Sequence, residues 1–370
     1  MATQASSVTT ETASSQGCLL FSPTADQARL SAALEDIPRY LFRVHAPKTA
    51  GQTTNKEVIS RAAMLGKPGA TTDILSMPAR SAAEMLNSHL RGWSRDGDNL
   101  MSWSSSLLFA LQYALYRNIK ERDRDELADI RVHVLDTSGL PPGALLPDAP
   151  LLDAFADKDS WKTYNLAKIR SLRRDTSYNF GEYLSQGTLS IEGRSTSTSL
   201  QEIINHGLFK LCPEMGEPNE KPELAKRVCR LRADCFATSV ATSKLEIRIA
   251  LSLAEGCFGD EWALPMMAAL LSLRRRRRND SVIVDAFSAN FSEKELRKHD
   301  LGALKSFSNE KLPEVYQFEK IIQDIHSYHC TRALDSVIAT TMRLSLSSQS
   351  PLKPKEHVTY IDVGDEVWEV

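Results

Sequence analysis

The hydrophobic pattern changes period within residues 100–116, LMSWSSSLLFALQYALY. Over residues 100–104 apolar and polar side chains alternate, as they do in a short half-buried strand. From Leu107 onward, apolar residues recur at helical spacing through Leu111 to Leu115. The pattern therefore predicts a strand that leads directly into an apolar helix, with one of the serines at positions 104–106 as the N-cap.

Three further stretches predict strands. Residues 39–44, RYLFRV, form an apolar run with Arg43 inside it. Residues 130–136, IRVHVLD, alternate most clearly, and we expect a structural strand without site residues there. Residues 178–189, YNFGEYLSQGTL, place Glu182 at the start of an apolar strand. Between the strands predicted at 39–44 and 130–136, the spacing of apolar residues predicts a helix over 81–90.

From residue 200 onward helical patterns dominate and runs of β-branched residues are few. We expect helices over 201–211, 223–253 (one long or two shorter), 261–278, 280–291 and 312–346. The sequence thus predicts an α+β fold. Its expected parts are a disordered or weakly helical segment at 1–35, a sheet domain at 36–195, a helical region at 196–346 and a tail at 347–370. Short strands at 358–363 and 367–370 are expected in the tail.

Composition narrows the class of protein. The hydrophobic content of 42% and the charged content of 25% are ordinary for a globular chain, and the net charge of −2 argues against overall nucleic-acid binding. No apolar run is long enough to cross a bilayer, and the first residues lack the pattern of a secretory signal. Six cysteines without a CxxC pair indicate reduced thiols. We therefore expect a cytoplasmic or nuclear protein without membrane contact.

Two charged residues fall inside predicted strands and are candidates for function. A buried charge needs a partner, so Arg43 requires an anion or a carboxylate unless it lies at a sheet edge in a salt bridge. Glu182 is either a surface position or the carboxylate of a site. Local pattern alone leaves both alternatives open.

Taken in order, three segments resemble the toxin-type ADP-ribosyltransferase superfamily. Arg43 in YLFRV matches the arginine on that family's first core strand, and Glu182 in GEYLSQG matches the glutamate on a later strand. Ser102-Trp103-Ser104 followed by LLFALQYA resembles the family's Ser-Thr-Ser strand and the helix after it. GEYLSQG is also similar to the corresponding strand of poly-ADP-ribose polymerases, which have histidine in place of the arginine. The resemblance covers residues 39–193, which also resemble an uncharacterised domain family of filamentous fungi.

This resemblance implies a split β-sheet domain that uses NAD as a substrate, either as an ADP-ribosyltransferase or as an NAD glycohydrolase. Glu182 and Ser102 would be catalytic, while Arg43 and Ser104 would bind NAD, and no metal is implied. The acceptor would be a protein, a nucleic acid or water. The chemistry suits the residue types, because a carboxylate stabilises an oxocarbenium-like centre and the arginine fork fits a pyrophosphate.

The chain departs from the family pattern at two positions. Trp103 replaces a small hydroxyl residue, and Phe180 stands two residues before Glu182, where branches that modify arginine or asparagine have Gln or Glu. These departures support an alternative, in which a catalytically degenerate domain of the same fold acts as an intracellular binding or interaction module.

Five consecutive arginines, at positions 274–278, follow the apolar stretch LPMMAALLSL. One interpretation is contact with a polyanion or a nuclear import receptor. The other is a solvated basic end of a helix that complements the helix dipole. We expect the run to govern location or polyanion binding and to contribute little to folding.

Overall fold

In the computed structural model, nine strands form one sheet in which every pair is antiparallel. The structure describes residues 18–93, 95–120, 124–217, 223–298, 312–347, 360–363 and 366–369. The strands are β1 Cys18–Leu19, β2 Tyr40–His45, β3 Gln52–Thr53, β4 Glu57–Ile59, β5 Leu100–Ser104, β6 Arg131–Asp136, β7 Leu146–Pro147, β8 Glu182–Ser190 and β9 Ser195–Ser199. Their order is β3-β4-β8-β5-β2-β6-β9, and β1 and β7 also pair with β8.

The sheet is nearly divided between β2 and β5. These strands share one residue pair, Phe42 with Ser104. By contrast, β2 pairs with β6 along its whole length, from Tyr40 to His45, and β5 pairs with β8 along its whole length. This junction lies beside Arg43, Ser102 and Ser104, three of the residues that the sequence analysis identified as candidates.

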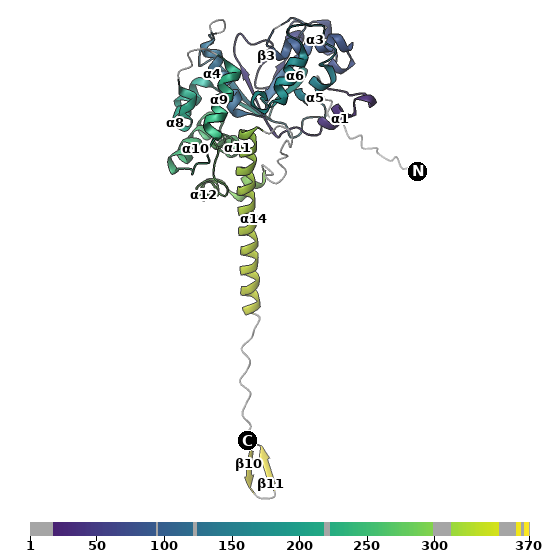
Figure 1. The fold of residues 1–370 in the computed structure, drawn as a ribbon. Coiled ribbons are helices and arrows are strands. Elements are labelled where there is room, and N and C mark those ends of the chain that lie inside the picture. The colour runs from purple at the N-terminus through teal and green to yellow at the C-terminus, as the bar shows by residue number, and fades with distance from the viewer. Residues whose placement is uncertain are drawn as a thin grey trace, which may run out of the picture. The chain divides into compact units, whose positions relative to one another are not determined.

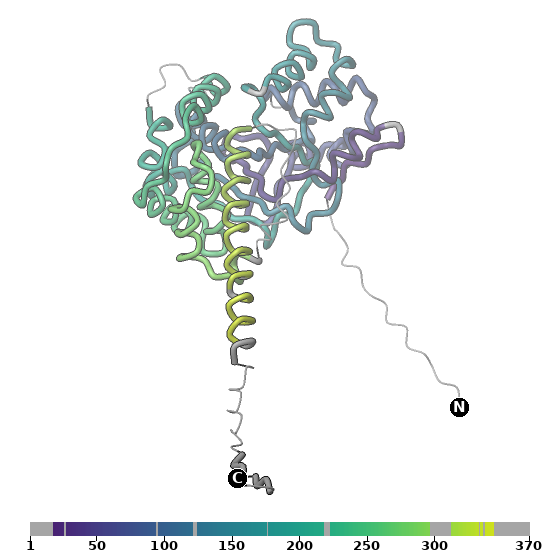
Figure 2. Tube along the Cα trace, turned by 60° about the horizontal axis from the view of Figure 1, so that its bottom comes forward, coloured from purple at the N-terminus to yellow at the C-terminus, as the bar shows by residue number. Residues whose placement is uncertain are grey.

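Helices cover this sheet in two groups (Figures 1 and 2). The described helices are α1 Ala28–Ala33, α2 Arg61–Met64, α3 Ala79–Leu90, α4 Leu107–Ile119, α5 Asp148–Phe155, α6 Leu166–Arg174, α7 Leu200–Asn205, α8 Leu208–Leu211, α9 Leu224–Phe236, α10 Lys244–Phe258, α11 Asp260–Leu271, α12 Ser281–Asn290, α13 Glu293–Lys298 and α14 Pro313–Ser347. Short 3-10 helices lie at Ala25–Gln27, Pro68–Thr71, Ile74–Ser76, Thr176–Tyr178 and Pro213–Gly216.

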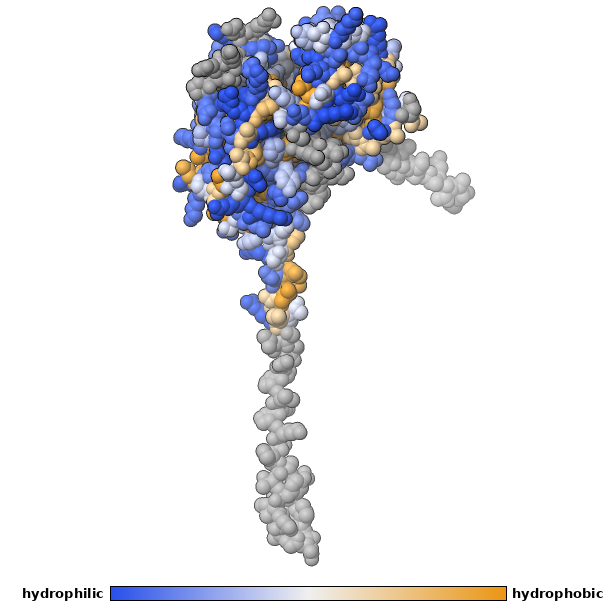
Figure 3. Space-filling model, in the orientation of Figure 1, coloured by the Kyte–Doolittle hydropathy of each residue, from blue (hydrophilic) through white to orange (hydrophobic). Residues whose placement is uncertain are grey.

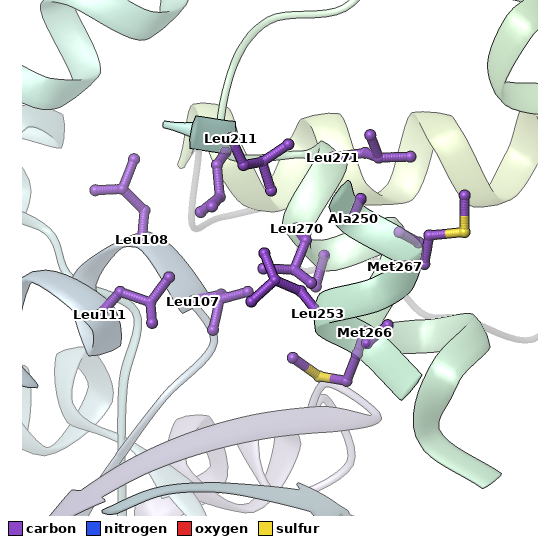
Figure 4. Close-up of a cluster of buried hydrophobic side chains, with 14 of the residues drawn as sticks. Leu107, Leu108, Leu111, Leu211, Ala250, Leu253, Met266, Met267, Leu270 and Leu271 are labelled. Carbon is purple, nitrogen blue, oxygen red and sulfur yellow. The ribbon is translucent and has the colours of Figure 1, made fainter. Parts of the chain in front are cut away.

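Successive side chains of a strand point to opposite faces of the sheet, so each packs against the elements that cover its own face. Leu100 and Leu184 pack against α3, α5 and α6 in one hydrophobic cluster. Phe42 and Val44 pack against α4, α10 and α11 in a second cluster, part of which Figure 4 shows. Because Phe42 lies opposite Ser104, these clusters cover one face of the sheet on the two sides of the β2–β5 junction. A third cluster, which includes Trp103, lies on the opposite face.

The expected α+β class is confirmed, and the strands predicted at 39–44, 100–104, 130–136 and 178–189 correspond to β2, β5, β6 and β8. The predicted helix at 81–90 corresponds to α3, and the stretch at 223–253 forms two helices, α9 and α10. The expected domain boundary at residue 195 falls inside β9, which pairs with β6. The helices that follow share a core with β2, β6 and α4. Residues 1–17 lie outside the described part of the chain.

The chain divides into two units, Met1–Ile325 and His326–Val370. The second contains the later part of α14 and a hairpin of β10 (Tyr360–Val363) and β11 (Glu366–Glu369), close to the strands expected in the tail. Leu334, Val337, Ile338 and Met342 are exposed on this part of α14, where apolar side chains gather (Figure 3). Within the described residues, no helix combines the length and apolar character needed to span a membrane.

Candidate active site

Ser102 and Glu182 meet because β5 and β8 are antiparallel neighbours. The register places Ser104 opposite Glu182, and alternation then puts Ser102 on the same face of the sheet. The Ser102 hydroxyl donates a hydrogen bond to Glu182 Oε1 at 2.7 Å. The side chain of Glu182 is 15% exposed. The site is therefore a carboxylate that is held in place by the neighbouring strand and still partly open to solvent.

The second oxygen of Glu182 binds an arginine on α6. Arg173 Nη2 donates to Glu182 Oε2 at 2.6 Å, and its Nε donates to Asp148 Oδ2 at 2.8 Å. Its Nη1 also donates to the carbonyl of Tyr178 at 3.0 Å, and the guanidinium lies 5.0 Å from the ring centre of Phe180. One guanidinium thus holds two carboxylates, and both of its carboxylate contacts are short, charge-assisted bonds.

A histidine on α3 holds Ser102 from the other side. His89 Nε2 lies 2.8 Å from Ser102 Oγ, and His89 Nδ1 lies 2.8 Å from Asp98 Oδ2. Ser102 uses its hydrogen on Glu182, so its oxygen must accept from His89 Nε2. Because Asp98 accepts from the other ring nitrogen, both nitrogens carry a proton and the ring is an imidazolium.

The electrostatics agree with a charged ring. Burial alone would lower the pKa of His89, but the charge and hydrogen bond of Asp98, together with the charge of Glu182, outweigh burial and raise this pKa above its ordinary value. The result is a continuous polar chain, Asp98–His89–Ser102–Glu182–Arg173–Asp148, which crosses from α3 over the two strands to α5 and α6. We call it the site chain.

Arg43 approaches Ser102 from the opposite face of the sheet. It follows Phe42, which shares a face with Ser104, so its side chain lies with Trp103 and its guanidinium is 5.7 Å from that ring. Its Nη1 donates to the Ser102 carbonyl at 2.7 Å and its Nε donates to Thr53 Oγ1 at 3.1 Å. Burial lowers the pKa of Arg43 to about 10. Arg43 is thus connected to the backbone of Ser102, and within the described part of the chain it forms no hydrogen bond or ion pair with the side chain of Glu182.

Ser104 holds the turn that ends β5. Its buried hydroxyl donates to the Phe180 carbonyl at 2.7 Å and accepts from the Ser106 backbone N–H at 3.0 Å. Ser106 is the N-cap of α4, because its Oγ accepts from the backbone N–H of Phe109. Ser106 Oγ also donates to Glu314 Oε1 at 2.5 Å. The expected N-cap among residues 104–106 is confirmed, and in this structure the hydroxyl of Ser104 contacts backbone.

Two histidines accompany Arg43 on the opposite face. His133 lies opposite Arg43 in the β2–β6 pairing, and its ring centre is 6.5 Å from that of His45. Burial and then the charge of Arg43 lower the pKa of His133 to about 3 and that of His45 to about 4. Neither nitrogen of His133 has a hydrogen-bond partner among the described residues. The strand expected to be purely structural therefore carries a buried neutral histidine beside Arg43.

Sequence reasoning brought Ser102 and Glu182 together. It also expected Arg43 in the same cleft, but the side chain of Arg43 lies with Trp103 on the opposite face of the sheet. It missed His89, Asp98 and Arg173. A weak signal was present at the end of α3, where polar Asn87 and Ser88 are buried just before His89. Polar residues that continue the buried face of a helix need partners. Nothing in the local pattern, however, identifies Ser102 as the partner of His89.

Residues 36–190 match the family model described as a domain of unknown function (DUF7587). This range covers β2 to β8 and includes every residue of the site chain as well as Arg43. Neither the curated proteins nor the solved structures contain a match to the chain. The match supports an uncharacterised domain over these residues, and the resemblance to ADP-ribosyltransferases stays a prediction.

Proposed function

We propose that the domain cleaves the nicotinamide–ribose bond of NAD at Glu182 and transfers ADP-ribose to a protein, a nucleic acid or water. The observation that supports this most is the Ser102–Glu182 hydrogen bond on adjacent strands. It joins two residues that are 80 positions apart and that the family resemblance selects independently. The narrow β2–β5 junction is also compatible with the split sheet that the resemblance implies.

Each group of the site chain has a physical role in this reaction. As the bond breaks, positive charge develops on the ribose, and a carboxylate stabilises that charge. Ser102 and Arg173 fix the two oxygens of Glu182, which keeps the carboxylate in one orientation and costs no rearrangement during the reaction. His89 in turn orients the hydroxyl of Ser102. His89 and Arg173 are therefore positioning residues.

The contacts of Arg43 change the role that we assign to it. Two of its three nitrogens already donate to Thr53 and to the Ser102 carbonyl, and the side chain is buried. We therefore assign Arg43 to fixing the backbone of Ser102 and not primarily to binding pyrophosphate. For the same reason we leave Ser104 out of the NAD contacts, because its hydroxyl is bound to backbone.

The interaction module without catalysis is the competing function. It is favoured by the observation that both oxygens of Glu182 have partners within the protein. Calorimetry with NAD and an assay for nicotinamide release separate the two proposals. Binding together with release that depends on Glu182 supports the enzyme, while the absence of both supports the module.

The arginine run supports a smaller, second proposal. Arg275, Arg277 and Arg278 are exposed, and we propose that these three contact a polyanion or an import receptor. The run was expected to contribute little to folding, but Arg276 is buried and donates to Glu246 Oε1 at 2.8 Å, so this arginine is part of the packed structure. Replacing the three exposed arginines with glutamine should weaken retention on heparin, and unchanged retention would contradict the proposal.

A further inference from the structure

Two cysteines and a glutamate converge on the side of the molecule built by the later helices. Cys212 follows α8, Glu214 lies in the 3-10 helix Pro213–Gly216, and Cys235 lies in the last turn of α9. Their ligand atoms all lie within 4.8 Å of one another. Both cysteines are buried. Two segments separated by more than twenty residues thus present three metal-ligating side chains to one point.

The spacing of these atoms fits a tetrahedral metal ion. Zinc binds thiolate sulfur at about 2.3 Å and carboxylate oxygen at about 2.1 Å, so tetrahedral angles place the two ligand atoms about 3.6 Å apart. The distance from Cys212 Sγ to Glu214 Oε2 is 3.5 Å. Thiolate ligands select zinc over magnesium or calcium, and a carboxylate is a common third ligand.

The surroundings balance the charge of such a site. Two thiolates and one carboxylate exceed the charge of Zn²⁺ by one negative unit, and Arg274 supplies one positive unit. Arg274 Nη2 lies 2.9 Å from Glu214 Oε2 and 3.2 Å from Oε1. Arg227 donates to the backbone carbonyl of Glu214 and so fixes the segment that carries the ligand. Such outer contacts orient metal ligands.

We propose that Cys212, Glu214 and Cys235 bind one zinc ion, with a water molecule at the fourth position. The side chain of Glu214 is 24% exposed, so water has access on that side. The ion would join the segment after α8 to the end of α9, and both pack into the hydrophobic cluster that includes α4. Local sequence does not indicate this site, because Cys212 and Cys235 do not form a CxxC pair.

The test measures metal content and metal spectroscopy on the full chain. Protein purified without chelator should contain about one zinc per chain. Cobalt substitution should produce a thiolate-to-cobalt charge-transfer absorption. Cys212→Ser and Cys235→Ser should each lose most of the zinc and of the absorption. Cys257→Ser is the matched control, because Cys257 is buried in the same half of the chain but outside the cluster.

The outcomes decide the proposal in either direction. A wild-type protein that retains no zinc and gives no charge-transfer absorption with cobalt overturns it. Equal loss of zinc in Cys257→Ser and Cys212→Ser also overturns it, because the effect would then be general. If the serine variants do not fold, the wild type alone is sufficient: zinc should protect two of its thiols from alkylation, and no protection would refute the site.

Discussion

Arg173 is the residue whose loss should most clearly reveal the site chain. Replacing it with methionine keeps an unbranched stem against Phe180 but leaves Asp148 and Glu182 without their shared cation. Removing one partner from a buried ion pair costs about 3–5 kcal/mol of unfolding free energy. The alternative for the protein is to protonate a carboxyl group. Because the pKa of Asp148 is already raised to about 6 with Arg173 present, protonating this group at pH 7 costs about 1 kcal/mol. The expected loss therefore lies between about 1 and 5 kcal/mol.

The adjacent residue provides a matched control. Arg174 pairs with Asp153, but these side chains are 66% and 48% exposed, so Arg174→Met should cost no more than about 1 kcal/mol. Urea unfolding at pH 7 compares the two variants. If Arg173→Met is no more destabilising than Arg174→Met, the guanidinium does not hold the two carboxylates in solution.

The pH dependence adds a second check on the same variant. Burial raises the pKa of Asp148 to about 6 even though Arg173 opposes the shift, and removing Arg173 should raise it further. A carboxyl group whose pKa is higher in the folded than in the unfolded protein lowers the free energy of unfolding as the pH rises from the unfolded to the folded pKa. The deficit of Arg173→Met relative to wild type should therefore shrink between pH 7 and pH 5.5, by up to about 1 kcal/mol, because Asp148 of the wild type also takes up protons over this range. A deficit that grows on acidification would contradict this assignment.

Three further predictions concern single side chains. Arg276→Gln should clearly lower the urea midpoint, because it breaks the buried ion pair with Glu246. Arg277 is exposed, so Arg277→Gln should change the free energy of unfolding by less than about 0.5 kcal/mol. Equal effects of the two substitutions would contradict the burial of Arg276. Gly181→Ala should destabilise the fold more than Gly193→Ala, although both glycines have positive φ. A Cβ at residue 181 would lie 2.0 Å from the hydroxyl of Ser105, whereas a Cβ at residue 193 would meet nothing within 4 Å. Similar losses of melting temperature would refute the close packing of Gly181 against Ser105. The raised pKa of His89 stabilises the fold at low pH, and this contribution disappears as the pH rises through that pKa; His89→Gln should therefore flatten the fall in stability between pH 6 and 9, and an unchanged slope would show that another group is responsible.

Local periodicity was sufficient for the parts of the fold that alternate strongly. The patterns over β5 and β6 predicted these strands, because apolar and polar side chains alternate along each of them, although the structure buries residues on both faces. Local periodicity did not predict β9, because its sequence STSTS contains no apolar residue; β9 lies at the edge of the sheet. Such a strand forms because β6 offers a paired neighbour, and that is a tertiary cause.

The site was predictable only where a strand register carries it. Ser102 and Glu182 meet through β5–β8 pairing, and the order of their motifs indicated this pairing. His89 and Arg173 reach the same point from α3 and α6, and their positions depend on how those helices pack on the sheet. The arginine run shows the same limit, because the burial of Arg276 depends on Glu246, thirty residues earlier.

The release of nicotinamide from NAD by wild type, Glu182→Gln and Glu192→Gln is the most direct test of the proposed function. Glu182→Gln keeps the side chain's size and can still accept from Ser102, but it removes the charge that stabilises the transition state. It should lower the rate by about a hundredfold to a thousandfold while NAD binding measured by calorimetry largely survives. Glu192 is an exposed carboxylate just after β8, and its replacement should leave the rate unchanged. Wild type that neither binds NAD nor releases nicotinamide, or Glu182→Gln that turns over as fast as wild type, would contradict the assignment of Glu182.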